Sequence, residues 1–284
     1  MVNVIAIIKR KPGTTVDAFQ DYWRTAHADI VRRLPGLRRY VQSHTLASGS
    51  RKGEPAWDGI AEIWFDSMDA LRALRGTPEQ AAVDADEPRF IDKATMTTLF
   101  TDEHVVKDAP VPAGAAKWVE FLTRRPDLTV EAFQRHWREV HGPIAARIPQ
   151  VRRYVQSHVR PGAYASGRTP RYDGVAITWF DDTQAMRASA ATAEYAATRA
   201  DEANFLASGD APFDAATRSG AGEIVELDRE AGTLALKRGP GLAGVELPEA
   251  LLPGRPYDTP WQEDALMRIG RCLLAGDRRY PAVE

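Results

Sequence analysis

The segment VDAFQDYWRTAHADIVRRLPGLRRYVQSH, residues 16–44, recurs as VEAFQRHWREVHGPIAARIPQVRRYVQSH at residues 130–158. Seventeen of the 29 aligned positions are identical, and they share the pattern F-x3-W-x3-H-x7-P-x4-Y-x3-H. The two copies begin 114 residues apart, a spacing far longer than the roughly 20–50 residues of a solenoid repeat. The chain therefore contains two copies of a whole small domain.

Composition and charge are those of an ordinary globular protein. The 284 residues are enough for about two domains, and a net charge of −2 gives no electrostatic basis for binding nucleic acid. Cys272 is the only cysteine, so an internal disulfide is excluded and a reducing compartment is favoured. The sequence shows neither a signal peptide nor an apolar span of about 20 residues. We expect a cytoplasmic protein with no membrane partner.

Each copy shows the same order of predicted elements. In the first copy, strands are predicted over 2–9, 37–46, 57–65 and 95–106, with one helix beginning at Val16 and ending before Pro35 and another opened by Asp66. The second copy repeats this order. Its strands are predicted over 117–123, 151–159 and 172–180, with a weaker last strand over 211–218. Its first helix is predicted over 130–149, and its second is opened by Asp181. The order β-α-β-β-α-β predicts an α+β fold with two ferredoxin-like units, residues 1–110 and 111–218.

Residues 219–284 differ in character from the repeats. A hairpin is predicted from the strands 224–228 and 233–237, followed by a Pro- and Gly-rich stretch over 239–260. A helix is predicted from Pro260 to a C-cap at Gly276. Since this extension has too few apolar residues for a core of its own, we expect it to dock on the repeats.

The repeated pattern resembles the EthD family, which is named for a protein of ethyl tert-butyl ether degradation. The resemblance rests on Phe19, Trp23, His27, Pro35, Tyr40 and His44, on the following Trp57-Asp58-Gly59 and Trp64-Phe65-Asp66, and on the same pattern in the second copy. It implies the dimeric α+β barrel superfamily, in which two ferredoxin-like units pair their sheets. A tandem chain can close such a barrel within itself, as a monomeric barrel or as a homodimer of tandem barrels.

His27 and His141 are the first candidate catalytic residues. Each follows a Phe and a Trp at four-residue steps, on the apolar face of the first helix. A histidine on such a face is often a hydrogen-bonded core group. In a fold whose small-molecule pockets lie beside this helix, as the resemblance implies, it is also the natural general acid or base.

A second group of candidates lies on the strand that follows this helix. Tyr40, Gln42 and His44 alternate along one strand, and so do Tyr154, Gln156 and His158, so each set shares one face. If that face is turned towards the helix histidine, the set forms a polar wall for a phenol or carbonyl; if it is turned away, the residues are barrel contacts. The proposed catalytic residues are His27, Tyr40, His44, His141, Tyr154 and His158, and the proposed substrate-binding residues are Trp23, Gln42, Glu62, Trp64, Trp137 and Gln156.

Glu62 aligns with Ile177, an asymmetry that favours chemistry in the first copy. The sequence shows no nucleotide, flavin or hydrolase motif and no third ligand at metal spacing, so neither a cofactor nor a metal is expected.

Three hypotheses follow from these residues and the resemblance. The first is a cofactor-independent enzyme that cyclises, dehydrates, isomerises or decarboxylates a small aromatic, polyketide-like or lactone substrate. The second is an oxidoreductase of the monooxygenase type, either cofactor-free or haem-dependent, in a catabolic or tailoring pathway. The third is a non-catalytic small-molecule binding protein.

Overall fold

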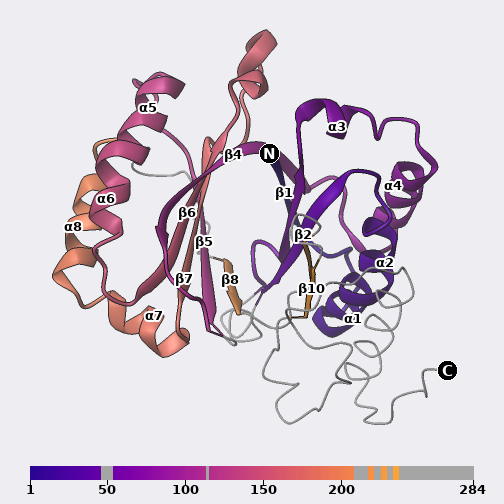
Figure 1. Ribbon diagram of the computed structural model, residues 1–284, viewed down its shortest axis with the longest axis horizontal. Helices are drawn as coiled ribbons and strands as arrows, with labels where there is room; N and C mark the ends of the chain where they lie inside the picture. The colour runs from indigo at the N-terminus through magenta and orange to yellow at the C-terminus, as the bar shows by residue number, and fades with distance from the viewer. Residues whose placement is uncertain (46–53, 113–114, 208–216, 221–224, 229–232, 237–284) are drawn as a thin grey trace.

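The computed structural model describes residues 1–45, 54–112, 115–207, 217–220, 225–228 and 233–236, and both repeats have the predicted β-α-β-β-α-β order (Figure 1). The strands are β1 (Val2–Ile8), β2 (Leu37–His44), β3 (Gly59–Phe65) and β4 (Thr97–Asp108) in the first repeat, and β5 (Ala116–Leu122), β6 (Val151–Val159), β7 (Gly174–Phe180) and β8 (Thr217–Gly220) in the second. The helices are α1 (Val16–Tyr22), α2 (Ala28–Val31), α3 (Met68–Arg72) and α4 (Pro78–Phe90), then α5 (Val130–His136), α6 (Gly142–Ala145), α7 (Thr183–Ser189) and α8 (Ala193–Glu202).

All eight strands belong to one antiparallel sheet. Their order is β2-β3-β1-β4-β6-β7-β5-β8, so β4 and β6 join the two repeats. The strands at the two ends of this order, β2 and β8, lie close together, and the sheet curls into a barrel with the helices outside (Figure 1). The predicted α+β fold, in which tandem ferredoxin-like units form a barrel within one chain, is confirmed.

Strand alternation divides the apolar residues into three cores. Ile5 and Ile7 of β1 lie inside the barrel with Val119 of β5 and Ile177 of β7. Their neighbours along the strands face outward, where each repeat packs its own helices on its half of the sheet. The outward face therefore supports a separate cavity in each repeat.

The first helix of each repeat contains a feature that the sequence pattern did not predict. A π-helical turn interrupts it at Trp23–His27 and again at Trp137–His141. The helix before each turn is capped by Thr15 in the first repeat and by Thr129 in the second. Such turns place one extra residue in the helix and are frequent at functional sites. In both repeats, this turn carries the shared tryptophan at its start and the candidate histidine at its end.

The second helical region begins one residue later than predicted. Ser67 and Asp182 are the N-caps of α3 and α7, and their side chains accept the capping hydrogen bonds. Asp66 does not open the helix because its carboxylate pairs with Arg38, and Asp181 is held in the same way by an arginine of the second repeat.

Gly59 and Gly174 allow the tryptophan of each π-helical turn to pack closely against the sheet. A Cβ atom at Gly59 would overlap the ring of Trp23, and one at Gly174 would overlap the ring of Trp137. The preceding Asp58 accepts a hydrogen bond from the backbone N–H of Arg10 at 2.9 Å. The repeated Asp-Gly pair therefore ties down a loop and leaves room for an indole ring.

The hairpin predicted in the extension is present as β9 (Val225–Asp228) and β10 (Thr233–Leu236), and β9 lies beside β2. The predicted helix after Pro260, its cap at Gly276, and Cys272 lie outside the described residues. Among the helices that the structure describes, none has the length and apolar character needed to span a membrane.

Candidate functional site

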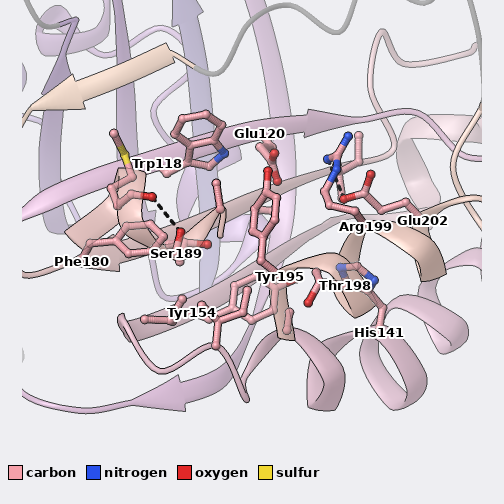
Figure 2. Close-up of a pocket in the computed structure, with 18 of the residues that line it drawn as sticks. Trp118, Glu120, His141, Tyr154, Phe180, Ser189, Tyr195, Thr198, Arg199 and Glu202 are labelled. Atoms are coloured by element: carbon pink, nitrogen blue, oxygen red, sulfur yellow. Dashed lines mark hydrogen bonds and ion pairs between the residues drawn. The ribbon is translucent and has the colours of Figure 1, made fainter. Parts of the chain in front are cut away.

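A cavity of about 240 Å³ lies in the second repeat, between the outer face of β5–β7 and the helices that cover it (Figure 2). Trp118 and Glu120 of β5 form part of its floor. Tyr195 and Glu202 of α8 contribute to the opposite wall, and His141 enters from the end of the π-helical turn. The cavity thus combines aromatic and aliphatic walls with several titratable groups.

His141 is oriented by a carboxylate. Its Nδ1 lies 3.0 Å from Oδ2 of Asp201. The other oxygen of this carboxylate, Oδ1, lies 3.1 Å from His136 Nε2 and accepts from Asn204 at 3.0 Å. Because a carboxylate only accepts hydrogen bonds, Nδ1 carries the proton and Nε2 is left as the basic nitrogen. Burial lowers the pKa of His141, although the hydrogen bond to Asp201 works against this shift. The imidazole is therefore neutral at pH 7, as a general base must be.

Two further acidic side chains line the same cavity. Burial, assisted by the charge of Glu120, raises the pKa of Glu202 to about 7, although Arg199 donates to Glu202 Oε1 at 2.7 Å. Burial also raises the pKa of Glu120. Figure 2 shows the ring of Tyr195 rising between the helix and Glu120, with its hydroxyl end directed towards that carboxyl. Glu202 is therefore partly protonated near pH 7.

The rest of the lining is apolar and aromatic. Trp118, Phe180 and Met186 surround one end of the cavity, and Phe205 packs against the ring of His141 at 4.8 Å between centroids. Aromatic walls of this kind bind flat, weakly polar molecules. The cavity suits a compact aromatic ligand whose acidic hydrogen or oxygen meets the polar residues.

The first repeat has a corresponding cavity of about 260 Å³ with different chemistry. His27 Nδ1 lies 2.8 Å from Asp86 Oδ2, so the His–Asp pair is retained, and burial likewise lowers the pKa of His27. The positions of Trp118 and Glu120 are taken by Val4 and Ala6. This cavity has the base but lacks the second repeat's buried floor carboxyl.

The shared face of Tyr40, Gln42 and His44 is turned towards the helices, which is the first of the two alternatives considered for this strand. Only the tyrosine of the set lines the cavity. Tyr40 lines the first cavity and Tyr154 the second. Gln42 instead donates to the Trp23 carbonyl oxygen at 2.7 Å and to the Tyr40 hydroxyl at 2.9 Å, and His44 Nε2 lies 3.0 Å from Gln42 Oε1. These contacts hold the π-helical turn against the strand.

The same network is present in the second repeat. Gln156 donates to the Trp137 carbonyl oxygen at 2.8 Å and lies 3.0 Å from His158 Nε2, and the rings of Trp137 and His158 stack at 4.4 Å. Burial lowers the pKa of His158 to about 3, as it does for His44. Neither histidine is among the residues that line the cavity of its repeat, and both hold the glutamine that binds the π-helical turn.

Glu62 and Trp64, which were predicted to bind substrate, line neither helix-side cavity but a separate pocket. Both point into the barrel, because they alternate with the helix-facing residues of β3. There Glu62 forms a buried ion pair with Lys117, which donates to Ser43 at 2.9 Å, and the Trp64 Nε1–H donates to Glu103 at 2.7 Å. The Glu62–Ile177 difference therefore does not distinguish the two helix-side cavities.

The sequence analysis missed two residues that line the second cavity, Glu120 and Glu202, and the two carboxylates that hold the histidines, Asp86 and Asp201. A second repeated motif pointed to three of these sites: DEPRF at 86–90 and DEANF at 201–205 share an Asp-Glu pair followed by Phe. Glu120 has no counterpart in the first repeat and carries no such signal. Among the described residues, no group of three potential ligands is arranged to hold a metal ion.

Comparisons with known proteins support the fold and the family. The model of the EthD domain matches residues 11–94 and 125–209. An EthD family protein of Bacillus halodurans C-125 is 28% identical over 37% of this chain and 99% of its own, with a TM-score of 0.32. No curated protein matches the chain.

Two other solved structures match most of the chain, and the first, with a TM-score above 0.5, shares its fold. An anthrone oxidase-like protein is 12% identical, covering 73% of this chain and 86% of its own with a TM-score of 0.53. A variant chlorite dismutase of Candidatus Nitrospira defluvii is 10% identical, covering 69% and 84% with a TM-score of 0.42. Since the EthD model matches both repeats, in the order and at the residues where the fold repeats, the chain belongs to the EthD family.

Proposed function

We propose that the second repeat holds the active site of a cofactor-independent oxidoreductase that oxygenates a small aromatic substrate at an acidic C–H bond. The observation that carries the proposal is the His141–Asp201 pair, which leaves a neutral imidazole with a basic Nε2 at an aromatic cavity. Removal of a proton by this nitrogen gives a resonance-stabilised carbanion. Such a carbanion is electron-rich enough to react with dioxygen directly.

The dimensions of the cavity support this substrate class. Its volume of about 240 Å³ lies slightly below the roughly 300–1,000 Å³ of pockets for drug-sized ligands, so a molecule of two or three fused rings is the upper limit. Trp118 and Phe180 supply flat walls for the rings.

The choice of an oxidoreductase over a non-redox enzyme rests on the fold relatives. One structure of related fold is named an anthrone oxidase-like protein, and anthrone is a compact tricyclic ketone with an acidic ring methylene. Cyclisation, isomerisation and decarboxylation need the same base but consume no oxygen. Proton removal by His141 is thus common to both, and oxygen consumption separates them.

The test uses anthrone as the probe, with oxygen uptake and quinone absorbance as readouts. His141→Asn keeps a donor for Asp201 but removes the basic nitrogen, so we expect turnover to fall by about 100-fold or more. His27→Asn is the matched variant in the first repeat and is expected to retain turnover. Loss of activity in both variants, or in His27→Asn alone, contradicts the assignment to the second repeat. Conversion of anthrone or of an enolisable lactone without oxygen uptake contradicts the redox assignment.

A further inference from the structure

Glu202 is the group that the proposed proton abstraction leaves unused. It is the last residue of α8 and directly follows Asp201, the partner of His141. Tyr195, Thr198 and Glu202 recur at helical spacing and line one wall of the cavity. Glu120 faces this wall from β5 (Figure 2). Two carboxyl groups therefore share the cavity with the base.

We infer that Glu202 is a second catalytic residue, the acid that protonates the oxygen end of the intermediate while His141 acts on carbon. This inference rests on the proposed function and deepens it. Its basis is the position of Glu202 on the cavity wall beside the His141–Asp201 pair.

The assignment gives a balanced reaction with dioxygen as the oxidant. His141 removes one proton from the ring methylene, and the resulting carbanion forms a C–O bond with dioxygen, which is reduced to a peroxide anion. Glu202 protonates the distal oxygen. The Glu202 carboxylate then takes the second carbon proton as the C=O bond forms and the O–O bond breaks. Hydroxide leaves and takes the proton held by His141. One methylene and one O₂ become one carbonyl and one water, and both residues regain their starting protonation.

The surroundings of Glu202 suit an acid that works near neutral pH. The charged or titratable groups that share the cavity wall with it or adjoin it are Tyr195, Arg199 and Asp201 on α8, Glu120 on β5, Tyr154 on β6, Arg187 on α7 and His141 at the π-helical turn. Burial and the charge of Glu120 raise the pKa of Glu202 to about 7, and Arg199 opposes them. A carboxylic acid with this pKa donates and recovers a proton at comparable rates.

The first repeat supplies a built-in comparison. Glu87 occupies the position of Glu202, but it forms an ion pair with Lys93 at the side of the first cavity. Ala6 stands where Glu120 stands in the second repeat, so the floor carboxyl is absent there, and the other carboxyl that lines the first cavity, Asp84, lies on α4. The first cavity therefore keeps the His–Asp pair but has no carboxyl on its floor.

The test measures the two half-reactions separately on the full chain. Exchange of the anthrone methylene hydrogens with D₂O without oxygen requires only the base, whereas oxygen uptake requires both groups. We expect Glu202→Gln to retain exchange within about twofold and to lose about 100-fold in oxygen uptake. His141→Asn loses both, and Glu87→Gln loses neither. Glu120→Ala, which copies the first repeat, is expected to move the fall in kcat at high pH to a lower pH.

The outcomes distinguish the role of Glu202 from the proposed function itself. If the unaltered protein exchanges and oxygenates anthrone but Glu202→Gln does both at the same rate, the role of Glu202 is refuted and the base assignment stands. If the unaltered protein does neither, the proposed function fails and the role of Glu202 fails with it. If Glu202→Gln loses exchange as well, circular dichroism and Glu202→Asp decide. A folded Gln variant without exchange, unrescued by Asp, also refutes a role confined to the steps after dioxygen adds.

Discussion

Nδ1 of His141 lies 3.0 Å from Oδ2 of Asp201, so one carboxylate fixes both the orientation and the tautomer of the candidate base. The first repeat builds the same pair from His27 and Asp86. In each case, the histidine ends a π-helical turn and the aspartate lies on the last helix of the repeat. Both repeats contain the His–Asp pair, but the residues on the floors of their cavities differ.

Replacing Asp201 with Asn tests whether tautomer control matters for turnover. The amide can donate to Nδ1, which would place the imidazole proton on Nε2 and remove the base. We expect kcat to fall by about 100-fold or more while KM changes little, since Asp201 is not among the residues lining the cavity. Steady-state oxygen uptake measures both constants. Asp86→Asn is the matched change in the first repeat, and an equal loss of kcat there would contradict a single active cavity.

The order of elements was predictable because the repeat supplies two readings of the same pattern. Apolar spacing gave the predicted strands and the first helix, and the structure places the N-caps of that helix at Thr15 and Thr129. Alternation also showed that Tyr40, Gln42 and His44 share a face. It could not show which face, because that depends on which side of the sheet the helices cover. Packing of the whole chain decides it.

The contacts between the repeats were beyond prediction from local patterns. The Lys117–Glu62 pair joins β5 to β3 across the barrel, and nothing in either segment encodes its partner. The π-helical turns were hidden for a different reason. Phe, Trp and His at four-residue steps fit an ordinary α-helix, so the additional residue in the turn leaves no periodic signal.

The buried Lys117–Glu62 pair gives a prediction about stability. Lys117→Met leaves the Glu62 carboxylate buried without its partner, so the free energy of unfolding should fall by about 3–5 kcal/mol. Adding Glu62→Ile, the residue that the second repeat has at this position, removes the stranded charge and should recover most of the loss. Urea denaturation of the single and double variants measures the coupling. Additive losses in the double variant would contradict a direct pairing across the barrel.

Gly174 should resist even the smallest substitution. A Cβ atom there would overlap the Trp137 ring, which is fully buried and cannot move aside, so Gly174→Ala is expected to lower the free energy of unfolding by about 1–3 kcal/mol. Gly162 is the control, because its Cβ position meets nothing within 4 Å. Thermal or urea unfolding distinguishes the two. Equal stability of the two alanine variants would show that the indole ring can reposition.

His44 and His158 predict how stability depends on acid. Burial lowers the pKa of each to about 3, whereas the unfolded chain takes up the proton near pH 6.5. Between these values, the unfolded state binds more protons than the folded state, so each histidine lowers the free energy of unfolding by about 1.4 kcal/mol per pH unit as the pH falls. This contribution is absent above pH 6.5 and complete below about pH 3.

The variants His44→Gln and His158→Gln isolate this effect from the acidic groups that titrate in the same range. Each loses a ring contact with Trp23 or Trp137, so each is expected to be less stable than the unaltered protein at pH 8. Their disadvantage should shrink steadily from pH 6.5 towards pH 4, because glutamine has no proton to bind. Urea unfolding at half-unit pH steps records the difference. A disadvantage that stays constant over this range would mean that these histidines titrate normally in the folded state, and that their surroundings admit water.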